Sequence, residues 1–155
     1  MLTKNTLMAG LTAGLLLGGL WSGTALADVD VKDPYSFVTS EKAMVGAAFM
    51  TIANTGEAEE KIIGASAPEV CDHVEIHSML ENDAGVMQMR KLEGGLAVPP
   101  SGEVELKPMG YHFMLIGLKA PLTEGQVIDL TLERESGDPV KVSVPVRPRV
   151  MPKAE

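Results

Sequence analysis

Cysteine is nearly missing from this sequence: Cys71 is the single one among 155 residues. An intramolecular disulfide is therefore impossible, so the stability of the fold must come from packing. Positive charge is also scarce, with 13 Lys and Arg against 21 Asp and Glu and a formal net charge of -8. No Lys/Arg cluster is available to follow a phosphate backbone, which argues against nucleic acid as a partner.

The recognisable signatures of catalysis are absent as well. The sequence shows no Ser/His/Asp order, no paired acid set and no phosphate-binding loop. We therefore do not expect an enzyme.

Only the N-terminus carries a long apolar run. Lys4 is followed by "LMAGLTAGLLLGGLW" and then by "SGTALA", in which Ala25 and Ala27 form the pattern of a signal-peptidase site. The run is short for a membrane span, which needs about 20 apolar residues. No Arg pair and no cysteine lies at the cleavage point, so neither twin-arginine export nor a lipid anchor is indicated. We interpret residues 1–27 as a Sec-type signal peptide of a protein exported to the periplasm.

Helical periodicity is missing from the remaining chain. Short β-rich runs separated by turn residues take its place, and no apolar stripe of helical spacing reaches helical length. The runs comprise residues 44–54, 60–66, 70–80, 85–92, 98–108, 111–118, 127–134 and 140–147. They predict a single all-β domain over residues 28–147, an antiparallel Greek-key sandwich or barrel, with a short loose tail at residues 148–155. We expect a monomer without stable membrane insertion.

Histidines and methionines recur at alternate positions of three of these strands. Side chains alternate between the two faces of a strand, and this puts three sets of residues together: His112, Met114, Ile116 and Leu118; His73, Glu75, His77 and Met79; and Met87 with Met89. Five methionines lie within or next to the segment from His77 to His112: Met79, Met87, Met89, Met109 and Met114.

Thioether and imidazole donors together favour one metal. A thioether is a soft neutral donor and an imidazole a borderline one, and this combination suits Cu(I). Calcium and magnesium require oxygen ligands, and zinc sites use Cys, His and carboxylates. Methionine is, however, a common filler of cores, so the pattern depends on how the strands pair.

These residues also carry a resemblance to a known family. The segment "VEIHSM…GVMQMRKL…VPPSGEVELKPMGYHFMLIGL" resembles the periplasmic copper chaperones called PCu(A)C. The spacings from His77 to Met89 and from Met89 to His112 are each one residue longer than in the family, and both extra residues can lie in turns. Met109 stands where the family often has Gly.

The resemblance implies a cupredoxin-like barrel with one Cu(I) site made by His77, Met89, His112 and Met114. It also implies a chaperone that delivers copper to the copper centres of cytochrome c oxidase during assembly. The expected partners are the apo copper-site subunit of that oxidase, a Sco-type protein, or both. Binding of Cu(II) stays open.

Two other classes of protein remain as alternatives. An electron-transfer cupredoxin needs two His and a Cys with a weak axial Met, and Cys71 precedes the His/Met pairs instead of lying just before a final His and Met. A β-sandwich binding module would use the same Met and His residues in its core. The roles of His73, Cys71, Met79 and Met87 stay open: we interpret His73 as a surface residue, Cys71 as buried, and Met87 as packing beneath the site.

Overall fold

The computed structural model describes residues 28–149, all of them in strands, turns and loops. The predicted signal peptide and most of the predicted tail therefore lie outside the described residues. No helix in the described part is long and apolar enough to span a membrane. The ten strands are β1 (Val29–Phe37), β2 (Val45–Asn54), β3 (Glu60–Ser66), β4 (Cys71–Glu81), β5 (Met87–Lys91), β6 (Leu96–Val98), β7 (Glu103–Leu106), β8 (His112–Leu118), β9 (Val127–Arg134) and β10 (Val140–Arg147).

Seven of these strands close into a barrel. The hydrogen-bonded order runs β4-β8-β2-β1-β10-β9-β3, and β3 pairs back onto β4 where Ala65 lies opposite Val74. The β1–β10 pair is parallel, whereas the other neighbours around the barrel are antiparallel. The predicted all-β, cupredoxin-like fold is confirmed.

The interior of the barrel is filled by one side of each strand. In β9 the residues Ile128, Leu130 and Leu132 are at most 1% exposed and alternate with more exposed neighbours. Phe113 and Leu115 of β8 are fully buried. Burial of such side chains contributes roughly 1.5–3 kcal/mol each, and it stabilises the barrel without a disulfide.

A buried ion pair joins the start of β3 to the end of β9. The Glu60 carboxylate on β3 accepts hydrogen bonds from Arg134 Nε at 2.9 Å, Arg134 Nη2 at 2.8 Å and Ser136 Oγ at 2.9 Å. Burial by itself would raise the pKa of Glu60, but these bonds and those from the backbone amides of Lys61 and Ser136 hold it below its ordinary value. The charge is buried and stays ionised because donors surround it.

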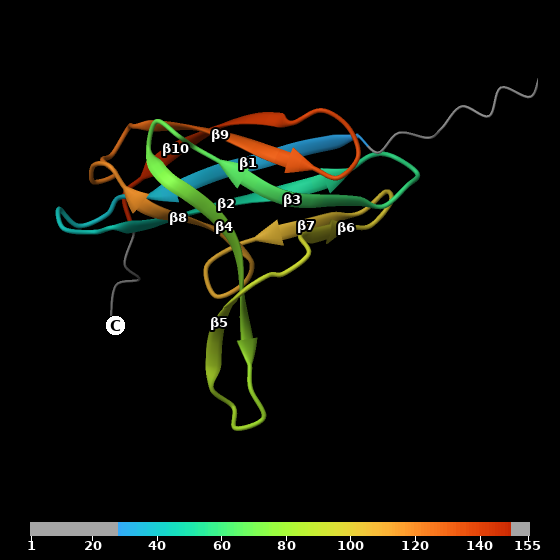
Figure 1. Cartoon of the computed structure of the whole chain (residues 1–155), viewed down its shortest axis with the longest axis horizontal. Helices are drawn as coiled ribbons and strands as arrows, with labels where there is room; N and C mark the ends of the chain where they lie inside the picture. The colour runs from blue at the N-terminus through green and yellow to red at the C-terminus, as the bar shows by residue number, and fades with distance from the viewer. Residues whose placement is uncertain (1–27, 150–155) are drawn as a thin grey trace, which may run out of the picture.

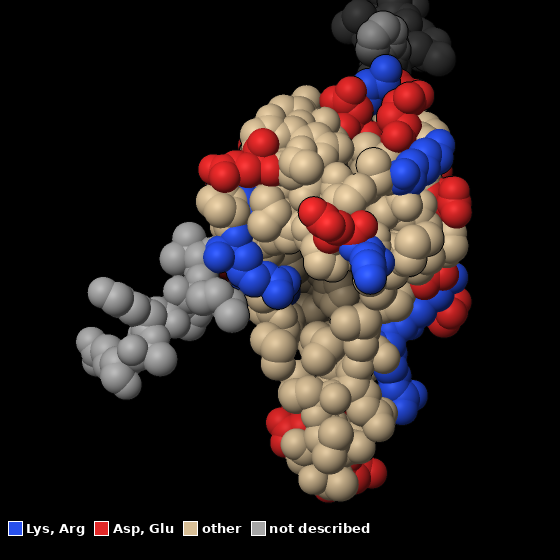
Figure 2. Space-filling view, turned by 90° about the vertical axis from the view of Figure 1, so that its left-hand side faces the viewer, with Lys and Arg blue, Asp and Glu red and all other residues tan. Residues whose placement is uncertain are grey.

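Strand β4 is longer than the barrel needs. Its second half leaves the body of the molecule and pairs with β5, which lies at the end of the strand order, so that a two-stranded hairpin projects outward (Figure 1). Figure 2 shows this hairpin as largely free of charged side chains on the face in view, with acidic residues near its tip. The surface is hollowed where the hairpin leaves the barrel (Figure 2).

Strand β1 and the end of β8 differ from the sequence-based expectation. Strand β1 was not predicted, because Pro34 and several charged residues hide its alternation; the chain bulges there, between Lys32 and Tyr35, with Asp33 at φ 43°. The prediction that Leu118 shares a face of β8 with Met114 was wrong. Gly117 has φ 71°, which interrupts the regular strand, and Leu118 is only 6% exposed in the core.

Candidate metal centre

The two predicted histidine ligands face each other across neighbouring strands. His77 of β4 is the direct cross-strand partner of His112 of β8. Their ring centroids are 5.8 Å apart and their planes are inclined by 46°. Opposite residues of an antiparallel pair have Cβ atoms about 4.5–5.5 Å apart, which suits side chains that share one small ion. The strand pairing on which the sequence argument depended is therefore present.

Among residues 28–149, only one of the two ring nitrogens of His77 has a hydrogen-bond partner. Its Nε2 lies 2.8 Å from Glu75 Oε2, and its Nδ1 is buried without a hydrogen-bond partner among the described residues. The hydrogen bond from His77, followed by the one from Lys91, lowers the pKa of Glu75, so this carboxylate is an acceptor. A neutral His77 that donates from Nε2 carries its lone pair on Nδ1. An unpaired buried nitrogen is costly unless a ligand satisfies it.

His112 is held in a comparable way by the backbone. Its Nδ1 lies 3.1 Å from the carbonyl oxygen of Gly110, which fixes the proton on Nδ1 and leaves the lone pair on Nε2. The side chain is 6% exposed, with its ring centroid 6.3 Å from that of Phe49. Burial lowers the pKa of His112; the bond to Gly110 opposes this shift, and the nearby His77 adds to it. The imidazole is thus kept neutral, the form that binds metals.

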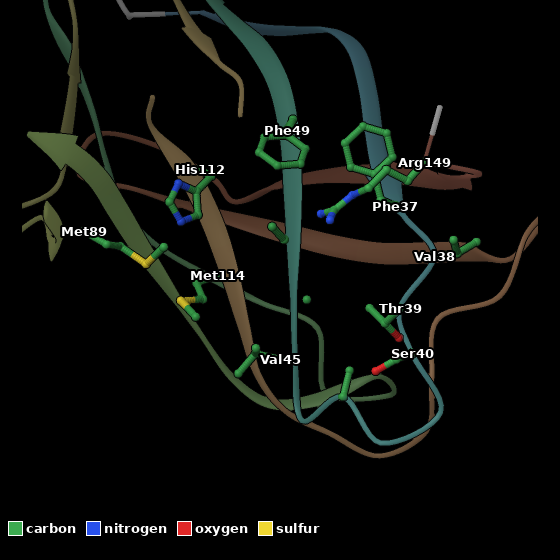
Figure 3. Close-up of a pocket in the computed structure, with 13 residues that line it drawn as sticks. Phe37, Val38, Thr39, Ser40, Val45, Phe49, Met89, His112, Met114 and Arg149 are labelled. Atoms are coloured by element: carbon green, nitrogen blue, oxygen red, sulfur yellow. The ribbon is translucent and has the colours of Figure 1, made fainter. Parts of the chain in front are cut away.

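Two thioethers lie beside the histidine pair. Met89 of β5 and Met114 of β8 line the same cavity as His112, a space of about 410 Å³. Figure 3 shows the sulfur atoms of Met89 and Met114 on the side of the cavity next to His112, directed toward each other from different strands. Met114 follows His112 by two residues and so lies on the same face of β8. All four predicted ligand residues thus lie where the hairpin joins the barrel. His77 does not line the cavity itself but faces His112, which does.

The remaining wall of the cavity is mostly apolar. It is formed by the end of β1, the loop that follows it and the start of β2, together with Arg149. The Arg149 guanidinium lies 5.6 Å from the centroid of the Phe37 ring, and Phe37 and Phe49 form adjacent parts of the wall (Figure 3). Such a wall limits the access of water to one side of the His/Met cluster.

The other residues that the sequence singled out lie away from the cavity. The His73 side chain is 56% exposed, which agrees with its interpretation as a surface residue. Cys71 is 1% exposed in the core, as expected, and burial raises the pKa of its thiol. Met87 is 40% exposed and does not line the cavity, so the interpretation that it packs beneath the site was wrong. Met109 is 67% exposed at φ 67°.

Sequence reasoning missed two contacts that prepare the histidines. Glu75 was placed on the face of His77 but given no role. Side chains two residues apart on one face of a strand can form a hydrogen bond, as these two do. The carbonyl of Gly110 carried no signal in the sequence, because only the turn geometry brings it to His112.

The chemistry of the cluster is restricted by its donors. Within residues 28–149 no group of three or more His, Cys, Asp or Glu is arranged to hold a metal ion. Two imidazoles and two thioethers are the donors that this site presents. Such a set can hold a soft cation such as Cu(I) without adding negative charge.

Comparisons with known proteins agree with this architecture. The sequence model of the family described as "Putative lipoprotein LpqE-like" matches residues 29–146. The curated "Putative lipoprotein Lxx21020" of Leifsonia xyli subsp. xyli is 35% identical over 101 residues, which are 65% of this chain and 60% of that protein. This chain therefore spans less than two thirds of the length of that relative.

Solved structures share the fold. The copper-bound PCuAC domain from PmoF2 has a TM-score of 0.65 at 21% identity and covers 81% of this chain and 97% of that domain. Apo-DR1885 from Deinococcus radiodurans has a TM-score of 0.59 at 25% identity, with 96% and 98% covered. The CuI form of DR1885 has a TM-score of 0.58 at 26% identity, with 82% and 83% covered.

Proposed function

This chain belongs to the LpqE-like family, and from that membership together with the His/Met cluster we propose that it is a copper chaperone that carries one Cu(I). The proposed ligands are His77 Nδ1, His112 Nε2 and the sulfur atoms of Met89 and Met114. One observation carries the proposal: two imidazoles face each other, each with its second nitrogen already engaged, beside two converging thioethers. Similarity to copper-bound PCuAC structures supports it.

The donor set suits transfer as well as binding. Four neutral ligands leave the site with only the charge of the ion, and thioethers bind Cu(I) less firmly than thiolates do. A recipient that offers cysteine thiolates can therefore take the metal. Met89 is 50% exposed at the mouth of the site, so an incoming ligand can replace it without opening the core.

The setting that we propose is the periplasm. Residues 1–27 would act as the export signal and be removed, and the relative's description as a putative lipoprotein fits an exported protein. The recipients that we propose are the copper centres of cytochrome c oxidase during their assembly, reached directly or through a Sco-type protein.

Titration of the exported protein with Cu(I) against a chromophoric chelator tests the proposal. We expect one tightly bound Cu(I) per chain, with both nitrogen and sulfur scatterers in X-ray absorption at the copper edge. A site with only oxygen and nitrogen scatterers would contradict the assignment of Met89 and Met114. An intensely blue Cu(II) form would instead indicate a thiolate ligand and an electron-transfer protein.

A further inference from the structure

Three methionines share one face of the projecting β4–β5 hairpin. Met79 is the direct cross-strand partner of Met89, and Met87 lies two residues from Met89 toward the tip, opposite Glu81. Residues of equal parity on paired strands lie on the same face, so all three side chains leave the hairpin on the side that carries His77. Met89 alone of the three lines the cavity.

Packing does not account for Met87 and Met89, whereas Met79 is partly buried. Met87 and Met89 are 40% and 50% exposed, whereas Met50 on the core strand β2 is 1% exposed. The usual role of methionine as a filler of irregular gaps in a core requires burial. Their common face thus presents two exposed thioethers, with that of Met79 beside them, next to a proposed Cu(I) site.

The spacing of the three residues fits a single soft ion. Directly opposite residues have Cβ atoms about 4.5–5.5 Å apart, and diagonal neighbours lie about 7–8 Å apart. Met79 and Met89 are opposite, and Met79 and Met87 are diagonal. A methionine side chain has three rotatable bonds beyond its backbone, so three sulfur atoms on this face can converge on one point.

We propose that Met79, Met87 and Met89 form a second, outer Cu(I) position on the hairpin, which shares Met89 with the inner His/Met site. Cu(I) reaches the inner site, and leaves it, by way of this outer position. This inference rests on the proposed function of the inner site. Because Met89 belongs to both positions, Cu(I) passes outward by exchange of one ligand at a time: the bonds to His77, His112 and Met114 break, bonds to Met79 and Met87 form, the bond to Met89 is kept, and the ion goes from four ligands to three. The ion stays Cu(I), and no proton moves because all of these ligands are neutral.

The charges near the outer position are compatible with a cation. Glu81 lies on the same face, opposite Met87. Lys91, which lies opposite His77 on that face, is paired with Glu75 at 3.1 Å. The face therefore combines soft donors with a carboxylate, and its lysine is neutralised by an ion pair.

The first experiment removes both imidazoles and measures the Cu(I) binding that is left. In His77→Ala/His112→Phe, we expect the tight binding to disappear and one weaker Cu(I) to remain, with sulfur as its main scatterer in X-ray absorption. Adding Met79→Leu and Met87→Leu should lower this remaining affinity by roughly tenfold or more, because two of three thioethers are lost. The matched control adds Met44→Leu and Met109→Leu, two methionines that are 64% and 67% exposed outside the hairpin, and should leave the remaining binding unchanged.

A second measurement uses the intact site, so that the test does not depend on folding of the histidine variant. Met79→Leu/Met87→Leu should keep the tight Cu(I) affinity within roughly twofold, the scatter expected for residues outside the site. It should, however, slow the removal of Cu(I) by a competing chelator in stopped-flow experiments.

The outcomes separate the two proposals. If the unaltered protein binds no Cu(I), the proposed function fails and the outer position fails with it. If the unaltered protein binds Cu(I) but the outer position is absent, then the histidine variant binds none, or the added hairpin substitutions change neither its binding nor the rate of removal. Slower delivery to a protein recipient, with no change in copper binding or in removal by a chelator, would identify the hairpin as a docking surface and also overturn the inference.

Discussion

Replacement of Met89 by leucine, compared with the same replacement of Met87, tests the position of the inner site most directly. The two residues share a strand, a face and a residue type, but only Met89 lines the cavity with His112 and Met114. A swap of methionine for leucine keeps volume and usually costs less than about 1.5 kcal/mol even in a core. At 50% and 40% exposure both substitutions should therefore leave the free energy of unfolding nearly unchanged.

The effect on copper should differ strongly between the two variants. Loss of a partner that merely orients a ligand typically costs about 10–100-fold in metal affinity, and loss of one of four direct ligands should cost at least as much. We expect Met89→Leu to lower the Cu(I) affinity by that factor and Met87→Leu to change it little. Competition titration with a chromophoric Cu(I) chelator measures both, and urea unfolding of the metal-free proteins checks that the fold is intact. An equal loss in the two variants, or a larger loss for Met87→Leu, would show that the assigned register is wrong.

Three further predictions concern groups around the site and in the barrel. Glu75→Gln should weaken Cu(I) binding by roughly tenfold or more, because the carboxylate that orients His77 is lost, and an unchanged titration would refute that role. Because a protonated imidazole cannot bind a metal and free histidine titrates near pH 6.5, Cu(I) affinity should fall as the pH drops below about 6, and the lowered pKa of His112 moves its part of this loss toward lower pH; constant affinity from about pH 7.5 down to about pH 5 would contradict ligation by histidine. Glu60→Gln should lower the free energy of unfolding by about 3 kcal/mol in urea titrations, since Arg134 loses a buried counter-charge. The depressed pKa of Glu60 means that its contribution is complete above about pH 4.3 and is lost as the pH falls through its folded value; equal acid sensitivity of Glu60→Gln and the unaltered protein would contradict this.

The parts of the site that could be predicted from the sequence are those that depend on strand parity. His77 shares a face with Glu75, and His112 shares a face with Met114. Both placements follow from the two-residue period of a strand and hold in the structure. The pairing of β4 with β8 could not be derived from that period, because it joins residues distant in sequence and depends on the closure of the barrel.

The parts that the sequence concealed are irregular ones. Strand β1 contains Pro34 and a bulge at Asp33, so its period is broken where a pattern would be sought. The same applies to Leu118, which a glycine at positive φ returns to the core. A local change in backbone conformation cannot be predicted from the alternation of apolar and polar residues. The glycine that permits it is the one sign in the sequence.

The ligands of the proposed site lie on strands of unequal local stability. His112 and Met114 belong to β8, which is held between β4 and β2 within the closed barrel, whereas Met89 belongs to β5 at the end of the strand order. Fraying of β5 from β4 is a local opening that leaves the barrel intact, and local openings cost far less free energy than global unfolding. Amide hydrogens of β5 should thus exchange with solvent much faster than those of Phe113 and Leu115. A bound Cu(I) that joins Met89 on β5 to His112 and Met114 on β8 would oppose that opening, so copper should slow amide exchange in β5 much more than in the barrel strands.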